Sequence, residues 1–221
     1  MKFSKQMSES IKLGIILAAA GGFMDAYSYI CRGKVFANAQ TGNMLLLGVH
    51  LSEQDWSGAV TYLFPVVSFA AGILASEYAR LRWKESGKLH WRQVAVLIEA
   101  VALFGVAFLP FHLNMLANSL TSFGCGIQVE CFRKIHGNGI ATTMCIGNLR
   151  SGTQNLFLYL HERKREFAEK SLLYYGIILC FILGAVIGNV CIKVLGRYAI
   201  TICAGILIIA FVMMFLDGEK E

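Results

Sequence analysis

Asp25 is the residue with the clearest chemical potential in this sequence, because it lies deep inside an apolar segment that starts at Ile11. A carboxylate at the centre of a bilayer costs about 2.5–3.5 kcal/mol on insertion scales, and by default such a residue has a functional role. A desolvated carboxyl can carry a proton or pair with a cationic substrate. A structural hydrogen bond, to Gln128, Ser28 or a backbone N–H group, is the alternative interpretation.

Two segments that each contain a Gly-Asn pair supply most of the other candidate residues. They run over Val35–Leu51 and Gly139–Leu160, and each has Asn, Gln or Thr in its first half and an apolar second half. Non-helical backbone at membrane depth is tolerated only inside protein or beside a water-filled cavity. We therefore predict a site for a substrate or an ion from Asp25, Asn38, Gln40, Thr41, Gly42, Asn43, Gln128, Thr142, Thr143, Gly147 and Asn148.

Each Gly-Asn segment is predicted to descend as an extended chain and then to form a half-helix. The first half-helix is expected over Met44–Val49, with Thr41 or Asn43 as its N-cap. Asn148 is expected to cap the second, over Leu149–Leu160. The free N–H groups and the dipole at such a helix start attract an anion or a polar oxygen. The alternative is that these small residues only let helices pack closely.

The composition predicts an integral membrane protein. Of the 221 residues, 56% are hydrophobic and 15% are charged, with a mean hydropathy of +0.58. Intrinsic disorder, a collagen-like repeat and a disulfide scaffold are excluded. The net charge of +6 comes from short basic clusters between apolar runs, which is typical of loops that orient membrane spans and argues against nucleic-acid binding. The seven cysteines include no C-x-x-C pair, so no metal or other cofactor is expected.

Six apolar segments are long enough to cross a hydrocarbon core of roughly 30 Å. They are Ile11–Ile30, Ser57–Ala79, Trp91–Leu109, His112–Phe132, Ser171–Ile192 and Tyr198–Leu216. If the two Gly-Asn segments dip into the membrane and return, the basic loops gather on one side, and only Arg32, Lys34, Lys193 and Arg197 lie on the other. If both segments cross, the basic residues divide between the two sides. The positive-inside rule therefore predicts six spans with both termini in the cytoplasm.

The two halves of the chain resemble each other. Gly42-Asn43 and Gly147-Asn148 are 105 residues apart, and at the same offset Gly21 matches Gly126. Each half reads as span, dip, span, span, over residues 1–110 and 111–221. We therefore predict an all-α membrane protein of about six transmembrane helices plus two short re-entrant or broken segments. Three spans per half make this a 3+3 inverted repeat in one membrane domain, as in many secondary transporters.

Gly22-Phe23-Met24-Asp25-Ala26-Tyr27-Ser28-Tyr29 and Val35-Phe36-Ala37-Asn38-Ala39-Gln40-Thr41-Gly42-Asn43 resemble a signature of the YoaK-like bacterial membrane proteins, a family catalogued as a domain of unknown function. Gly126-Ile127-Gln128 and Thr142-Thr143 before Gly147-Asn148 are similar to its second signature. The resemblance covers nearly the whole chain and implies a multi-pass protein of the bacterial inner membrane. Ile146, before Gly147, and Glu130 depart from the family pattern, so the two dips are not assumed to do the same job.

Three further acidic residues fall in or near the spans. Glu130 and Glu77 each precede an arginine by three residues, Arg133 and Arg80, and are expected to form interfacial ion pairs. Glu99 is expected to pair with a group on a neighbouring helix.

These observations favour a small secondary transporter or permease for a small polar or anionic solute, proton-coupled through Asp25. A passive channel and a non-transporting membrane partner or assembly protein are the alternatives. An enzyme is not expected, because the sequence lacks a Gly-x-Ser-x-Gly elbow, an H-E-x-x-H helix and a nucleotide loop. The expected partners are the lipid bilayer, an unidentified small solute and protons, and a homo-oligomer stays open.

Overall fold

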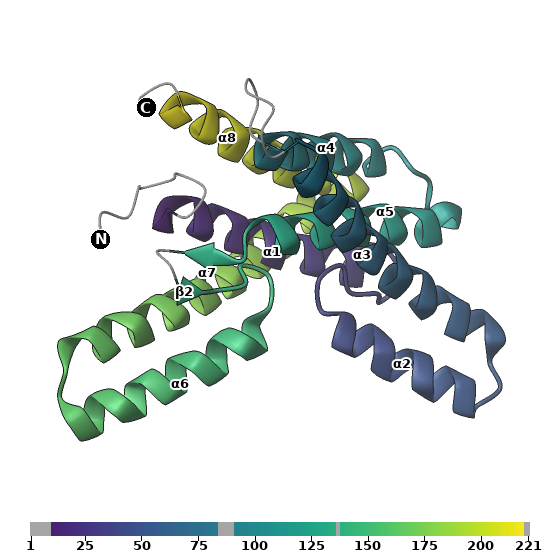
Figure 1. Cartoon of the computed structure of the whole chain (residues 1–221). Helices are drawn as coiled ribbons and strands as arrows, with labels where there is room; N and C mark the ends of the chain where they lie inside the picture. Colours follow the sequence, from purple (N-terminus) through teal and green to yellow (C-terminus); the bar gives the residue numbers. More distant parts are fainter. Residues whose placement is uncertain (1–9, 84–90, 136–137, 219–221) are drawn as a thin grey trace.

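The computed structural model describes residues 10–83, 91–135 and 138–218, and helices form most of this part of the chain. The helices are α1 (Ile11–Cys31), α2 (Gln40–Ser52), α3 (Trp56–Trp83), α4 (Trp91–Val106), the 3-10 turn η2 (Phe111–Leu113), α5 (Asn114–Cys131), α6 (Cys145–Glu162), α7 (Arg165–Leu195), the 3-10 turn η3 (Gly196–Ala199) and α8 (Ile200–Gly218). A two-residue antiparallel ladder pairs β1 (Lys134–Ile135) with β2 (Asn138–Gly139). The all-α fold class is confirmed (Figure 1).

Among the described residues, three helical stretches are long and apolar enough to cross a membrane: Ile11–Cys31, Trp56–Arg82 and Arg165–Met214. The third has 50 residues and contains both α7 and α8, so it covers two predicted spans. The break between them falls at Gly196, whose positive φ of 54° suits a residue without a Cβ. The predicted spans Trp91–Leu109 and His112–Phe132 correspond to α4 and α5 and are not among the three. Helix α4 is shorter, with 16 residues, and α5 has 18 residues with several polar side chains.

Polar side chains fix where α1 and α3 begin. The Ser10 hydroxyl accepts a hydrogen bond from the Leu13 N–H at 3.2 Å and caps α1. The Asp55 carboxylate accepts one from the Gly58 N–H at 3.0 Å and caps α3. The same carboxylate contacts the His50 ring nitrogen at 2.8 Å, which ties the end of α2 to the start of α3.

Helices far apart in the sequence form the main contacts of the bundle. Helix α1 packs on α7, α3 packs on α5, and α4 packs on α8. Helix α2 folds back along α3, and α6 folds back along α7. In Figure 1 the turn between α2 and α3 and the turn between α6 and α7 lie at opposite ends of the molecule.

Glycines let the backbones touch at two of these crossings. Where α1 meets α7, a Cβ on Gly22 would overlap the Phe181 carbonyl oxygen. Where α3 meets α5, a Cβ on Gly126 would overlap the Phe69 carbonyl oxygen. Small residues at helix crossings are typical of membrane proteins, in which close backbone packing replaces the hydrophobic effect between helices.

The buried core lies where α1, α4, α5 and α8 meet, and it contains Leu13, Leu17, Phe23, Met24, Leu103, Cys125, Ile200 and Leu207 among others. Many apolar side chains on α3 and α7 are exposed instead, for example Leu74 at 70% and Val194 at 79%. Apolar surface of this extent fits contact with lipid. Residues 84–90 lie outside the described residues, and they include Lys84 and Lys88, which were predicted to be cytoplasmic.

Candidate functional site

Asp25 lies on the buried face of α1 and holds the loop that follows this helix. Its carboxylate accepts a hydrogen bond from the Asn38 N–H at 2.7 Å. The Asn38 side-chain nitrogen donates to the carbonyl oxygen of Gly21, one turn before Asp25, at 3.2 Å. Of the partners expected for the carboxylate, the structure therefore shows a backbone N–H group. Ser28 instead donates to the Asp25 main-chain oxygen, and Gln128 bonds elsewhere on α1.

Arg32 anchors the same loop, and it is a structural residue that the sequence interpretation missed. Its guanidinium is buried and donates to the Tyr27 hydroxyl at 2.9 Å, to the Leu109 carbonyl at 2.9 Å and to the Val106 carbonyl at 2.8 Å. Cations are stabilised near carbonyl groups at a helix C-terminus, which here is the end of α4. The sequence placed Arg32 among the loop charges, because nothing near it in the chain identifies these distant carbonyls.

The first loop–helix segment, residues 32–39 with α2, is closed by Asn43. This side chain accepts from the Phe36 N–H at 3.0 Å and donates to the Phe36 carbonyl at 2.8 Å and to the Gln40 side-chain oxygen at 2.8 Å. The Gln40 amide nitrogen donates in turn to the Ala37 carbonyl at 2.8 Å. The predicted half-helix exists, but it begins at Gln40, and its N-cap Ala39 has no side-chain bond. Asn43 lies inside the first turn and bonds back to the loop, so the N-cap predicted for it or for Thr41 is wrong.

The second loop–helix segment, residues 140–144 with α6, repeats only part of this arrangement. The Asn148 amide nitrogen donates to the Ala141 carbonyl at 2.7 Å, the counterpart of the bond from Asn43 to Phe36. Helix α6 begins at Cys145, three residues earlier than the cap predicted at Asn148, so that prediction is also wrong. The hydroxyls of Thr142 and Thr143 are buried and have no hydrogen-bond partner among the described residues.

Side chains from three elements converge on one face of α1. Leu17, Gly21 and Asp25 follow one another at four-residue spacing and therefore share that face. Gln128 of α5 donates to the Leu17 carbonyl at 3.3 Å. A Cβ on Gly21 would lie 2.7 Å from the methyl carbon of Thr143, so the second segment touches α1 at this glycine. With Asn38 bonded to Gly21 and to Asp25, both loops and α5 contact the stretch of α1 between Leu17 and Asp25, and we call this cluster the α1 site.

Three predicted site residues lie away from the α1 site. Thr41 and Gly147 are exposed. Gly42 packs closely against Phe36, because a Cβ there would lie 2.8 Å from the ring. The α1 site therefore contains Asp25, Asn38, Gln128 and Thr143 with Thr142 next to it, while Gln40, Asn43 and Asn148 shape the loops.

Glu99 on α4 is buried completely, and both its carboxylate oxygens have no hydrogen-bond partner among the described residues. The predicted pairing with a neighbouring helix is therefore wrong. Its methylene carbons pack against Gly124 of α5, where a Cβ would lie 3.0 Å from the Glu99 Cγ. An isolated buried carboxylate is costly, so a carboxyl in this position is expected to be neutral.

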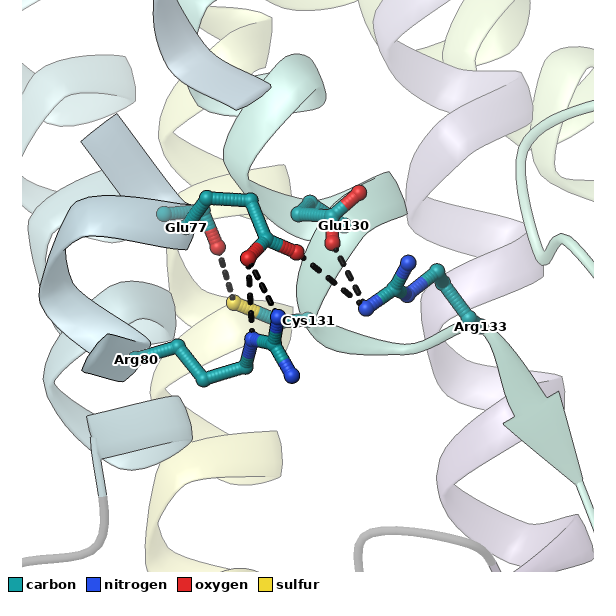
Figure 2. Close-up of polar contacts among 6 residues, drawn as sticks. Glu77, Arg80, Glu130, Cys131 and Arg133 are labelled. Atoms are coloured by element: carbon teal, nitrogen blue, oxygen red, sulfur yellow. Dashed lines mark hydrogen bonds and ion pairs between the residues drawn. The ribbon is translucent and has the colours of Figure 1, made fainter. Parts of the chain in front are cut away.

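A separate cluster of ion pairs lies where α3 and α5 end (Figure 2). Arg133 bridges the two helices, at 2.9 Å from the Glu130 carboxylate and 3.2 Å from that of Glu77. Arg80 adds a second contact to Glu77, with its Nε at 3.0 Å. Both predicted ion pairs are confirmed, and the bridge between the helices is additional. In the described ranges, no three His, Cys, Asp or Glu side chains gather in a way that could hold a metal ion.

Comparison with known proteins gives a family match of unknown function. Residues 13–213 match the sequence profile of DUF1275, a family described as "Protein of unknown function". The UPF0700 transmembrane protein YoaK of Bacillus subtilis (strain 168) is 27% identical to this chain, in an alignment that covers 93% of this chain and 95% of that protein. No solved structure matches the chain.

Proposed function

The chain belongs to the DUF1275 family of membrane proteins, and we propose that it is a small secondary transporter that moves a small polar solute, coupled to a proton on Asp25. The observation that carries this proposal is the α1 site. There a carboxylate inside the bundle accepts a hydrogen bond from the first loop–helix segment, and the second segment and Gln128 contact the same helix one and two turns before it. Polar and ionisable groups inside a membrane are expensive and generally mark substrate or ion pathways.

The helix contacts support an inverted repeat as the architecture. With α1 equivalent to α5, α2 to α6, α3 to α7 and α4 to α8, the contact of α1 with α7 corresponds to that of α5 with α3. The contacts of α2 with α3 and of α4 with α5 correspond to those of α6 with α7 and of α8 with α1. The glycines at the two corresponding crossings are Gly22, where α1 meets α7, and Gly126, where α5 meets α3. This pairing differs by one residue from the sequence offset, which matched Gly21 with Gly126.

In the proposed topology, α1, α3, α4, α5, α7 and α8 cross the inner membrane, and both termini are cytoplasmic. The two loop–helix segments enter from opposite faces and return to the face from which they came. Two features support this topology, namely the basic loops that it places in the cytoplasm and the opposite directions of the α2–α3 and α6–α7 turns in Figure 1. The starts of α2 and α6 would then meet near the middle of the membrane, where transporters of this kind bind their substrates.

The solute is proposed to be neutral or cationic. The N–H group of Asn38 near the start of α2 already faces a carboxylate of the protein itself, so an anion would meet a like charge there. The first segment therefore does not favour the anionic solutes that the sequence analysis included.

A non-transporting membrane partner is the second candidate. The hydrogen bond from Asn38 to Asp25 favours it, because this bond alone would give a buried carboxylate a structural role. A passive channel has no observation of its own in its favour.

Proton movement driven by solutes tests the proposal. The purified protein is first screened by thermal shift against small polar solutes, and the solutes that stabilise it are added to proteoliposomes that contain a pH-sensitive dye. We expect at least one solute to change the internal pH with wild-type protein and not with Asp25→Asn. Asp55→Asn, at an exposed carboxylate, is the matched control and should behave as wild type. Equal proton movement in Asp25→Asn would refute the coupling, and no stabilising solute together with a much less stable Asp25→Asn would favour the structural role.

A further inference from the structure

The α1 site contains more hydrogen-bond acceptors than donors. Four polar side chains there or adjoining it are almost fully buried, at 2% exposure for Asn38, 1% for Gln128, 1% for Thr142 and 3% for Thr143. One oxygen of each has no hydrogen-bond partner among the described residues. Buried polar atoms are nearly always paired, so these unpaired oxygens on the elements that pack against α1 need an explanation.

The orientation of the two amides shows that the surplus consists of acceptors. Asn38 and Gln128 both use their nitrogen to donate to carbonyl oxygens of α1. Their oxygens are therefore the free ends, and they accept but cannot donate. The hydroxyls of Thr142 and Thr143 can donate or accept, but neither donates to these amide oxygens among the described residues.

The charge at the α1 site is also unbalanced. None of the ion pairs among the described residues involves Asp25. The nearest basic residue along the chain, Arg32, is directed at the end of α4 and at Tyr27 instead. The Asp25 carboxylate accepts hydrogen bonds from neutral backbone N–H groups of residues 37–39, and no positive charge pairs with it in the described chain. A buried carboxyl of this kind is stabilised either by taking up a proton, as in the proposed function, or by binding a cation.

From these two imbalances, we infer that the α1 site binds a dehydrated monovalent cation of the size of Na⁺, with the Asp25 carboxylate as its counter-charge. Carboxylate, amide and hydroxyl oxygens are the hard ligands that alkali and alkaline-earth cations prefer. A single carboxylate matches a single positive charge, which favours a monovalent ion over Ca²⁺ or Mg²⁺. The inference builds on the proposed function, since it names a second ion, besides the proton, that the same carboxylate can hold.

Cation-dependent thermal stability in detergent tests this site. The protein is unfolded at constant ionic strength and pH in the chlorides of choline, Na⁺, K⁺ and ammonium. A ligand that binds only the folded state raises the melting temperature in a concentration-dependent way. We expect Na⁺ to stabilise wild type relative to choline and Asp25→Asn to lose that shift. No shift in wild type beyond that in choline would overturn the inference, and so would a larger shift with ammonium than with Na⁺, since it would assign the site to an amine.

Thr143→Val is the second variant, because it keeps the shape of the side chain and removes only the hydroxyl. If Thr143 is a ligand, the apparent Na⁺ affinity should fall about tenfold, which corresponds to roughly 1.4 kcal/mol. Thr121→Val is the matched control, because Thr121 is equally buried but its hydroxyl already donates to the Ala117 carbonyl at 2.8 Å. Equal Na⁺ shifts in Thr143→Val, Asp25→Asn and wild type would show that the ion does not bind here.

The two proposals fail separately. If Na⁺ does not bind but solute-driven proton movement still depends on Asp25, the cation site is refuted and the proposed function stands. If Na⁺ binds through Asp25 and no solute moves protons, the cation site stands and proton-coupled transport falls.

Discussion

The two loop–helix segments occupy corresponding places in the sequence, 105 residues apart, yet their loops are held differently. In the first, Asn43 makes three hydrogen bonds, Gln40 adds another, and Asp25 receives the Asn38 N–H. In the second, Asn148 makes one bond to Ala141, and two threonine hydroxyls have no partner in the described chain. The first segment is therefore the more closely held support for Asp25, with the Asn38 amide oxygen still unpaired, whereas the second segment has fewer bonds and two unpaired hydroxyls.

If the proposed site binds a ligand, this difference would divide structural and binding roles between the two segments. The bond from the Gly-Asn asparagine to the carbonyl seven residues earlier is common to both segments and fixes how each loop turns into its helix. The additional bonds occur only in the first. Ile146, which departs from the family pattern, lies in the second segment, whose loop has fewer hydrogen bonds. This agrees with the expectation from the sequence that the two segments need not do the same job.

The largest expected effect comes from a feature that both halves share, the helix crossings. Gly22→Ala and Gly126→Ala would each press a methyl group into a backbone carbonyl that cannot rotate away. We expect each to destabilise the protein by about 3 kcal/mol, at the upper end for overpacking, and to reduce its abundance in membranes. Gly105→Ala, with no atom near the added carbon, is the control. Thermal unfolding in detergent checks this, and normal stability in either crossing variant would contradict the packing described.

Asn43→Ala and Asn148→Ala test the difference between the segments. The first removes three hydrogen bonds and leaves the Phe36 N–H and carbonyl groups without them, so we expect a loss of about 3 kcal/mol. The second removes one bond and should cost about 1 kcal/mol. The measurement is the melting temperature of both variants beside wild type. Equal losses would mean that the second loop is as tightly held as the first.

Gly42→Ala and Gly147→Ala sharpen the same comparison with a smaller change. A methyl group on Gly42 would touch the Phe36 ring at 2.8 Å, whereas Gly147 has nothing within 4 Å. Because a ring can shift, we expect Gly42→Ala to cost about 1 kcal/mol. Gly147→Ala should be neutral or stabilise α6 by about 0.5 kcal/mol, as alanine generally does within a helix. The opposite order of melting temperatures would contradict the assigned packing.

The smallest expected effect concerns the turns that follow α2 and α6. Hydrogen bonds from the Gly58 N–H and from His50 hold the pKa of Asp55 below its ordinary value, whereas the start of α7 has no side-chain cap. A lowered folded-state pKa contributes stability above the unfolded pKa and loses it as the pH falls. The difference in melting temperature between wild type and Asp55→Ala should therefore be present at neutral pH and shrink below about pH 4. A difference that does not change with pH would show that the charge plays no part.

Composition and periodicity were sufficient to predict the apolar helices, the all-α class and the two Gly-Asn elements. The predicted pairs of Glu77 with Arg80 and Glu130 with Arg133 also form, since residues three apart on a helix are neighbours. What the sequence could not predict depends on distant contacts. The bonds of Asn43 and Asn148 back to their loops, the burial of Arg32 and the isolation of Glu99 all depend on where other helices pack.

The sidedness of the α2–α3 and α6–α7 turns tests the central claim most directly, which is that two re-entrant segments meet at Asp25 from opposite faces. Single cysteines at Gln54 and Lys164, both exposed, are placed in a background without the seven native cysteines. In intact cells they are labelled with a membrane-impermeant maleimide before and after permeabilisation. We predict that Gln54→Cys is labelled from outside and Lys164→Cys only after permeabilisation. Labelling of both from the same side would mean that the segments cross the membrane completely, and it would contradict the inverted repeat and the shared central site.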